Sequence, residues 1–180
     1  MKVLMVCLGN ICRSPMADGL LRKKVKEENL DVEVDSAGTS DYHIGAAPDH
    51  RMRATAKKLG CPIDELRARQ FSVQDFDQFD LIYAMDTSNY NNILALSRNE
   101  NDTAKVHLIL NELYPEENRA VPDPYFGGEQ GFIDVFNMLD EVTDVVINKL
   151  KNGRLHSLKT AKIEEPLYTL WQFEIPIKSL

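Results

Sequence analysis

An apolar run that leads into a helix start is the feature that most constrains the fold of this chain. Lys2–Cys7 reads KVLMVC, and a continuous apolar run of this length is typical of a strand buried on both faces of a parallel sheet. After a short loop, Ser14-Pro15 indicates the start of a helix, with Ser14 as the N-cap. A strand, a tight loop and a helix in this order predict the first unit of a doubly wound α/β domain.

Strand-like and helix-like segments alternate along the rest of the chain. The predicted strands are Lys2–Cys7, Val32–Ser36, Phe79–Met85 and Val106–Leu110. The predicted helices are 14–28, Asp49–Leu59, Thr87–Leu96 and Phe132–Leu150. The alternation predicts a three-layer α/β/α fold with a central four-stranded parallel sheet, in which ligands bind at the carboxyl ends of the strands. The Pro- and Gly-rich segment Asn111–Gly131 is predicted to be a long surface loop, and loops of this length are usually functional.

The charge and cysteine content exclude several classes of partner. The 180 residues carry a net charge of −7, which disfavours binding to nucleic acid and to anionic membranes. The apolar run after Lys2 is too short for a signal or transmembrane segment, and three cysteines do not suggest a disulfide scaffold. We therefore expect a cytoplasmic, reducing setting. The histidines show no metal-ligand spacing, so we expect no metal and no cofactor.

The loop between the first strand and the first helix has the pattern C-x5-R-S. Consecutive backbone N–H groups in such a loop form an anion-binding nest, and the helix that follows adds its positive N-terminal end. Gly9 permits backbone angles that a side chain would resist, and Asn10 tolerates the left-handed conformation. Arg13 supplies a planar fork for two phosphate oxygens. The predicted phosphate-binding residues are Leu8, Gly9, Asn10, Ile11, Cys12, Arg13 and Ser14.

Cys7 is the predicted nucleophile of this loop. The field that binds an anion also favours a thiolate, and the Ser14 hydroxyl can donate a hydrogen bond to the sulfur. A thiolate beneath a bound phosphate monoester implies an S-phosphocysteine intermediate. The pattern C-x5-R alone occurs by chance, and a buried cysteine at a strand end is usually inert. Gly9, Asn10 and the strand–loop–helix setting favour the catalytic interpretation.

The loop and four further segments resemble one family. VCLGNICRSPMA looks like the signature of the low-molecular-weight protein tyrosine phosphatases, and the likeness covers about residues 1–151. The other matching segments are Ser36–Thr39, Ala68–Gln70, Met85–Asn89 and Val121–Gly128. The resemblance implies a cysteine-dependent, acid phosphatase-like protein-tyrosine phosphatase. Its expected partners are phosphotyrosine-containing proteins, with a tyrosine kinase as a further candidate.

Asp123 is the candidate general acid. A phenolate is a poor leaving group, so a carboxylic acid must protonate it and a base must later activate water. Asp123 lies between two prolines, which stiffen its position, although many Asp residues in Pro-rich loops only form turns. The resemblance favours the catalytic role, because DPYF matches the family's D-P-[Y]-[YF] motif. Phe126 stands where the family often has a second Tyr.

Aromatic walls would favour phosphotyrosine over the shorter phosphoserine. The candidate cleft residues are Leu8, Tyr42, Tyr125 and Phe126, with loop packing as the alternative for the three aromatic residues. His43 is expected to be a solvent-facing loop residue. In the related protein arginine phosphatases a Thr occupies the position of Ile11, so Ile11 argues against phosphoarginine as the substrate.

Cys12 is a candidate redox partner of Cys7. A sulfenate on Cys7 could be trapped by Cys12 as a reversible disulfide, as the resemblance also implies. The alternative is a packed loop thiol. Leu66 departs from the family, where a His or Ser often stands, so a hydrogen bond that supports the phosphate loop must be supplied otherwise or be missing.

Two other functional classes are less consistent with the sequence. Thioredoxin-coupled arsenate reductases share the scaffold but need two further cysteines well downstream of the nucleophile, and no cysteine follows Cys61. A phosphotyrosine-binding module without activity would keep Arg13 but lose Cys7 or Asp123, and both are present.

The C-terminal segment does not fit the family pattern. We expect residues 1–152 to form the phosphatase domain and residues 153–180 to form an extension of unknown role. Within the extension, apolar and polar residues alternate over Trp171–Lys178, which is typical of a strand, and Pro176 restricts such a strand to a sheet edge. The apolar strip could pack on its own domain, on a partner or on a second copy of the chain, and a dispensable extension is the alternative.

Overall fold

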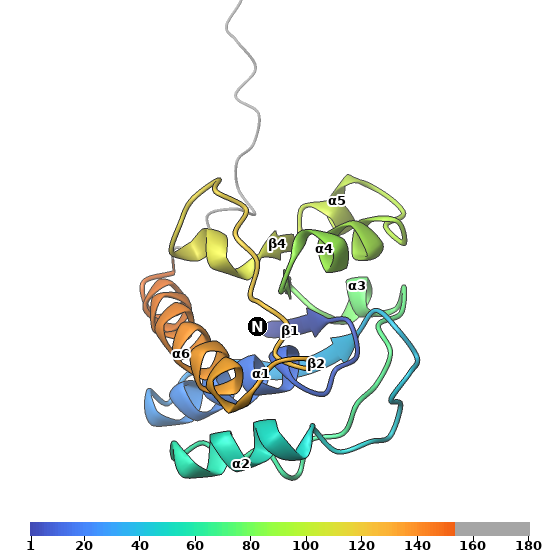
Figure 1. The fold of residues 1–180 in the computed structure, drawn as a ribbon. Helices are drawn as coiled ribbons and strands as arrows, with labels where there is room; N and C mark the ends of the chain where they lie inside the picture. The colour runs from blue at the N-terminus through green and yellow to red at the C-terminus, as the bar shows by residue number, and fades with distance from the viewer. Residues whose placement is uncertain (154–180) are drawn as a thin grey trace, which may run out of the picture.

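The sheet at the centre of the molecule has four parallel strands. The computed structural model describes residues 1–153, and the strand order is β2-β1-β3-β4 (Figure 1). The strands are β1 Lys2–Cys7, β2 Glu33–Gly38, β3 Leu81–Ala84 and β4 Val106–Leu108. All the pairings are parallel, and Cys7 lies beside Gly38 at the carboxyl end of the β1–β2 pair. The predicted four-stranded parallel sheet is confirmed.

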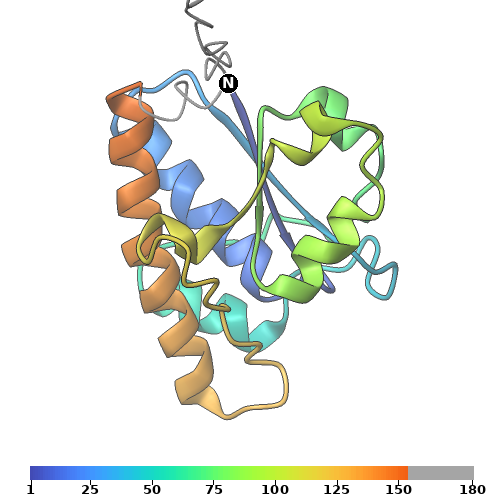
Figure 2. The same ribbon diagram turned by 90° about the horizontal axis from the view of Figure 1, so that it is seen from above.

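Helices cover both faces of this sheet. They are α1 Arg13–Glu27, α2 His50–Lys58, α3 Asp75–Gln78, α4 Thr87–Leu94, α5 Glu100–Thr103, the 3-10 helix η1 Ile109–Glu112, and α6 Glu129–Lys151. Figure 2 shows α1 and α6 on one side of the strands and α4 and α5 on the other. This is the predicted three-layer α/β/α arrangement.

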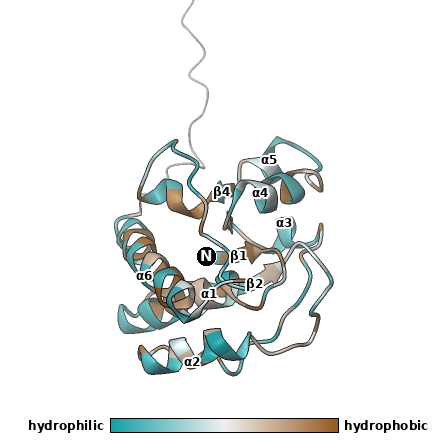
Figure 3. Ribbon diagram, viewed as in Figure 1, coloured by the Kyte–Doolittle hydropathy of each residue, from teal (hydrophilic) through white to brown (hydrophobic). Residues whose placement is uncertain are grey.

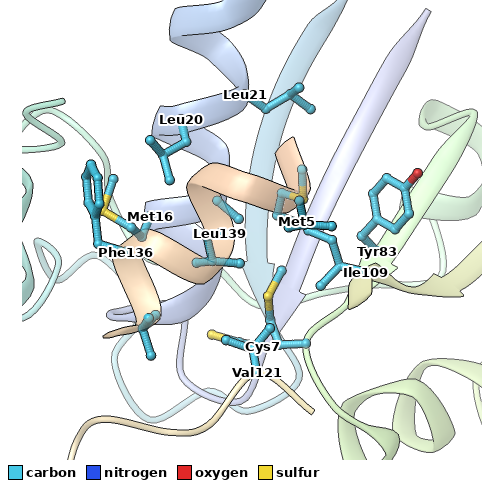
Figure 4. Packing of buried hydrophobic residues seen from close by; sticks show 14 of the residues in the cluster. Met5, Cys7, Met16, Leu20, Leu21, Tyr83, Ile109, Val121, Phe136 and Leu139 are labelled. Atoms are coloured by element: carbon cyan, nitrogen blue, oxygen red, sulfur yellow. The ribbon is translucent and has the colours of Figure 1, made fainter. Parts of the chain in front are cut away.

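Side chains of β1 alternate between two hydrophobic cores, one on each face of the sheet, which explains why its sequence is apolar throughout. Val3, Met5 and Cys7 belong to the core on the side of α1 and α6, whereas Leu4 and Val6 belong to the core on the opposite face. In Figure 3 β1 is mainly hydrophobic, while α2 is mainly hydrophilic. Figure 4 shows the first core from close by, with side chains of α1 and α6 gathered around the strand. Because both faces of β1 are packed, the strand has no freedom to shift its register, and Cys7 is fixed at its end.

The start of α1 differs from the prediction. The helix begins at Arg13, its N-cap is Cys12, and no side chain caps it, so Ser14 lies within the first turn. The predicted N-cap role of Ser14 is wrong because its hydroxyl makes contacts inside the loop, with Cys7, Asn10 and Ala37.

The predicted long loop is shorter than expected. η1 extends to Glu112 and α6 begins at Glu129, so the irregular segment covers residues 113–128. α3, α5 and η1 were not predicted, because a helix of one turn has too few residues to show a period. The predicted strand Trp171–Lys178 and the self-association of the extension lie outside the described residues. Within residues 1–153, no helix has the length and hydrophobicity needed to cross a membrane.

A buried carboxyl group joins α1 to β2. Both Nε and Nη2 of Arg22 donate to Asp18 Oδ1, at 3.1 and 2.9 Å, and Ser36 Oγ donates to Asp18 Oδ2 at 3.1 Å. The Asp18 side chain is fully buried, whereas that of Arg22 is half exposed. Burial raises the pKa of Asp18 from 3.8 to about 6, against the opposing effect of Arg22. The ionised carboxyl is therefore less stable in the folded chain than in the unfolded one.

This raised pKa predicts the pH dependence of folding in Asp18→Asn. The stabilisation that comes from protonated Asp18 is complete below pH 3.8 and is lost as the pH rises through about 6. Relative to the wild type, the free energy of unfolding of Asp18→Asn should therefore rise between these values, by about 2–3 kcal/mol in total. Urea unfolding of both proteins at a series of pH values measures this difference, and parallel pH curves would contradict the assignment.

Candidate active site

The loop from Cys7 to Arg13 folds around the sulfur of Cys7. Asn10 N donates to Cys7 Sγ at 3.3 Å, and Asn10 adopts the left-handed conformation with φ of 55°. Its side-chain Nδ2 donates to Ser14 Oγ at 2.9 Å. Asn10 therefore does what its sequence position predicted, since it holds both ends of the loop together from a backbone conformation that most residues resist.

Ser14 is the second contact of the sulfur. Its Oγ lies 3.0 Å from Cys7 Sγ and 3.2 Å from the carbonyl oxygen of Ala37. Asn10 Nδ2 already donates to Ser14 Oγ, so the single proton of the Ser14 hydroxyl is free to point to Cys7 or to Ala37. A thiolate at Cys7 can thus receive hydrogen bonds from a backbone amide and from a hydroxyl, and both favour the charged sulfur.

Arg13 is the buried cation of the site, with 3% of its surface exposed. Its Nη1 donates to Asp86 Oδ2 at 2.6 Å and to the carbonyl oxygen of Val121 at 3.2 Å. Its Nη2 donates to Asp123 Oδ2 at 3.1 Å. Burial alone would lower the pKa of Arg13, but Cys7, Asp86 and Asp123 raise it, so the guanidinium stays charged.

Asp86 is a site residue that the sequence reasoning did not single out. It lies just after β3, and its Oδ1 accepts a hydrogen bond from Asn89 N at 2.7 Å, which makes it the N-cap of α4. Its other oxygen holds Arg13. Its position at the carboxyl end of a strand next to β1 was the available signal, because such ends meet at one edge of a parallel sheet.

Asp123 makes the turn that is one interpretation of its loop, and its carboxyl group also faces the cleft. Its Oδ1 accepts a hydrogen bond from Tyr125 N at 3.1 Å, which is the turn that Asp residues in such loops commonly make. Its Oδ2 faces Arg13, and 40% of its side-chain surface is exposed. The carboxyl group therefore lies at the cleft, beside the phosphate loop and accessible to solvent.

A cleft with a volume of about 200 Å³ opens above Cys7. All four predicted wall residues line it, with Tyr42 and Phe126 far more exposed than Leu8 and Tyr125. His43, a partly exposed loop residue, lines it as well. Its ring packs on the glycine of the phosphate loop, since a Cβ on Gly9 would lie 3.0 Å from His43 Cδ2. The flat rings of Tyr42, His43 and Tyr125 therefore line the cleft, which stays open at its rim.

Two neighbouring segments support the loop from below. Arg69 N donates to Asn10 Oδ1 at 3.0 Å, which supplies a supporting hydrogen bond despite the presence of Leu66. Gly38, at the end of β2, lies directly under the loop, where a Cβ would be 2.7 Å from Leu8 O and 3.1 Å from Asn10 N. Among the described residues, no group of three or more His, Cys, Asp or Glu side chains is placed to hold a metal ion.

The chain is similar to one family of known proteins. The sequence profile described as "Low molecular weight phosphotyrosine protein phosphatase" matches residues 2–155. The chain belongs to this family. The family's protein of Schizosaccharomyces pombe is 43% identical over 141 residues, which cover 77% of this chain and 89% of the relative. The human protein is 41% identical over 137 residues, or 74% of this chain and 85% of the relative.

A solved structure shows that the likeness extends to the fold. The protein tyrosine phosphatase of Entamoeba histolytica, crystallised with Hepes in the active site, superposes with a TM-score of 0.80 at 38% identity. The match covers 86% of this chain and 99% of the other chain. The phosphatase family and the α/β fold that the sequence indicated are both confirmed.

The close approach of Gly38 to the loop predicts the effect of Gly38→Ala. The added methyl group would meet backbone atoms of Leu8, Gly9 and Asn10, including the amide that donates to Cys7, so the loop must shift. We expect the affinity for inorganic phosphate and the turnover of para-nitrophenyl phosphate to fall about 10–100-fold. Gly128→Ala is the matched control, because a Cβ there meets nothing within 4 Å. Equal activity of the two variants would contradict the proposed contact.

Proposed function

We propose that this protein hydrolyses phosphotyrosine in proteins through a phosphoenzyme on Cys7. The observation that carries the proposal is the convergence of Cys7, Arg13 and Asp123 on one cleft, from the end of β1, the start of α1 and the loop before α6. These three residue types are the nucleophile, the anion-binding cation and the proton donor that cleavage of an aryl phosphate requires. Membership of a family whose curated members are named phosphotyrosine protein phosphatases supports the same function.

In the first step, the Cys7 thiolate attacks the phosphorus of the bound phosphotyrosine. The S–P bond forms while the P–O bond to the tyrosine breaks, and protonated Asp123 gives its proton to the departing phenol oxygen. The backbone amides of the loop and Arg13 bind the phosphoryl oxygens, on which negative charge is held throughout the transfer. The products of this step are the dephosphorylated tyrosine and S-phosphocysteine.

In the second step, water replaces the sulfur on phosphorus. The ionised Asp123 takes a proton from the attacking water, the O–P bond forms and the S–P bond breaks. The electron pair of that bond returns to Cys7, where Ser14 Oγ at 3.0 Å and Asn10 N at 3.3 Å stabilise the thiolate as a leaving group. Inorganic phosphate leaves, and Asp123 again carries the proton for the next cycle.

The walls of the cleft select the substrate. Leu8, Tyr42, Tyr125 and Phe126 place apolar and aromatic surface above the loop, where a phenyl ring can stack. A phosphoserine side chain has no ring to stack on these walls. The apolar and aromatic lining therefore favours phosphotyrosine-containing proteins.

Cys12 is proposed as the redox partner of Cys7. Both thiols are buried and line the same cleft. Burial, followed by the charge of Asp49, raises the pKa of Cys12 well above its usual range, so Cys12 stays protonated and does not compete as a nucleophile. Peroxide would oxidise the Cys7 thiolate to a sulfenate, and condensation with the Cys12 thiol would release water and form a disulfide that external thiols reduce.

Cys7→Ser tests the nucleophile. We expect turnover of para-nitrophenyl phosphate to fall about 10³-fold or more, since a neutral hydroxyl replaces the thiolate. Cys61→Ser is the matched control, because Cys61 is also a buried cysteine but lies outside the cleft. Retained turnover in Cys7→Ser, with its fold intact by circular dichroism, would refute the mechanism.

The substrate class is tested by direct comparison of two phosphorylated peptides. We expect kcat/KM for a phosphotyrosine peptide to exceed that for a phosphoarginine peptide of the same sequence by about tenfold or more, because Ile11 and the aromatic walls favour an aryl group. Faster cleavage of phosphoarginine would overturn the assignment to phosphotyrosine.

The redox role of Cys12 is tested by recovery from oxidation. After peroxide treatment and then incubation with a thiol, the wild type should regain most of its activity, whereas Cys12→Ser should regain less because its Cys7 oxidises further to an irreversible state. Equal recovery of the two proteins would reject a protective role for Cys12.

A further inference from the structure

Arg51, in the first turn of α2, contacts Asp49, which is hydrogen-bonded to the phosphate loop, and Tyr125, in the loop that carries Asp123. We infer that Arg51 is a positioning residue that fixes the Asp123 carboxyl over the phosphate loop. The inference rests on the proposed role of Asp123 as general acid and base. The inference adds to the proposed site a residue that lies far from the C-x5-R-S motif. The contacts on each side of Arg51 support the inference separately.

On one side, Arg51 is tied to the phosphate loop through Asp49. Arg51 Nε and Nη2 donate to the two oxygens of Asp49, at 3.0 and 2.9 Å, and Arg51 N donates to Asp49 Oδ1 at 2.8 Å. Asp49 N in turn donates to the carbonyl oxygen of Ile11 at 2.8 Å. The side-chain hydrogen bond from Arg51 holds the pKa of Asp49 below its usual value, so the pair stays charged at neutral pH. The planar, bidentate contact fixes the direction of the guanidinium.

On the other side, Arg51 lies against the loop that carries Asp123. Its Cζ is 5.3 Å from the centre of the Tyr125 ring and 4.7 Å from that of Phe132, the buried residue in the first turn of α6. Tyr125 N donates to Asp123 Oδ1, so the residue that Arg51 contacts is, with Arg13 at Oδ2, one of the two that orient the carboxyl. A guanidinium over an aromatic face is attracted by the ring and packs on it.

These contacts form a continuous series that begins and ends at the phosphate loop. It runs from Ile11 in the phosphate loop through Asp49 and Arg51 to Tyr125 and Asp123, and Asp123 returns to the loop at Arg13. The backbone hydrogen bonds from Gly127 N to Pro124 O and from Gly131 N to Gly128 O are local turns that tie residues 124–131 only to themselves. Phe126, at the tip, is 94% exposed. Arg51 thus supplies an anchor between this segment and the body of the domain.

A positioning role differs measurably from a general structural role. If Arg51 places the acid, its loss will slow substrates whose leaving group needs a proton, such as phenyl phosphate. It will have little effect on para-nitrophenyl phosphate, whose leaving group departs more easily without one. A loss of folded protein instead lowers both rates in proportion, so the ratio of the two kcat/KM values does not depend on the active fraction.

The experiment measures kcat/KM for these two aryl phosphates in Arg51→Gln, Asp123→Ala and the double variant. Arg53→Gln is the matched control, because it removes a guanidinium from the same helix and Arg53 instead contacts Pro48 and Asp64. We expect Arg51→Gln to lower kcat/KM for phenyl phosphate about tenfold, a part of the larger Asp123→Ala loss, and that for para-nitrophenyl phosphate less than about threefold. Arg53→Gln should change neither by more than about twofold.

The double variant separates this inference from the proposed function. Adding Arg51→Gln to Asp123→Ala should cause no further selective loss on phenyl phosphate, because there is no acid left to position. Proportional losses on both substrates in Arg51→Gln, or a selective loss that persists in the double variant, would overturn the role of Arg51. If Asp123→Ala itself showed no selective loss, the proposed role of Asp123 would fail instead.

Discussion

The buried guanidinium of Arg13 joins three parts of the chain that are distant in sequence. It pairs with Asp86 after β3, with the backbone at Val121 and with Asp123, while its own backbone begins α1. A buried charge is tolerated only when its partners satisfy it, so the burial of Arg13 requires all three segments to be in place. The cation proposed to bind the phosphoryl group is therefore also the group that joins these segments at the site.

The parallel sheet makes this assembly possible. Because β1, β2 and β3 run in the same direction, their carboxyl ends bring Cys7, Gly38 and Asp86 to one edge. The packing there leaves little space: β2 must end in a glycine, since any larger residue would collide with the backbone of the phosphate loop. The position of Cys7 is thus set by strand register and close packing, and the contacts of Arg13 hold the segments of Asp86 and Asp123 beside it.

The residues that line the cleft could be predicted, the loop from its own pattern and Asp123 and the walls with the family resemblance, whereas the contacts that join distant segments could not. The phosphate loop is one continuous segment, so its pattern alone favoured an anion-binding nest with Cys7 and Arg13 as candidate functional residues. Asp86 lies in the family-like segment Met85–Asn89 at the end of a strand, but neither feature specified its contact with Arg13. Arg51 has no local pattern that distinguishes it from an ordinary helix-start residue, and its contact with Tyr125 joins distant parts of the chain. The packing of His43 on Gly9 could not be predicted for the same reason, because it depends on a loop path that no periodicity encodes.

Local rules also competed with the demands of the site. Ser14-Pro15 is a regular helix-start signal, and the helix does begin there. The Ser14 hydroxyl, however, contacts Cys7 and Asn10, and Cys12 occupies the N-cap position. The single turns α3, α5 and η1 escaped prediction because their residues carry too little period. The four parallel strands and the three layers were predictable from the alternation of strand-like and helix-like segments, which is the strongest signal that a sequence of this class contains.

Detection of the phosphoenzyme tests the central claim most directly. A phosphotyrosine peptide would be mixed with the protein and quenched in acid within milliseconds, and the protein would then be digested for mass spectrometry. The account predicts one phosphoryl group on the peptide that contains Cys7, none on that containing Cys61, and none in Cys7→Ser. A phosphoryl group on any other residue, or phosphate release at the normal rate without a trapped intermediate in Cys7→Ser, would contradict it.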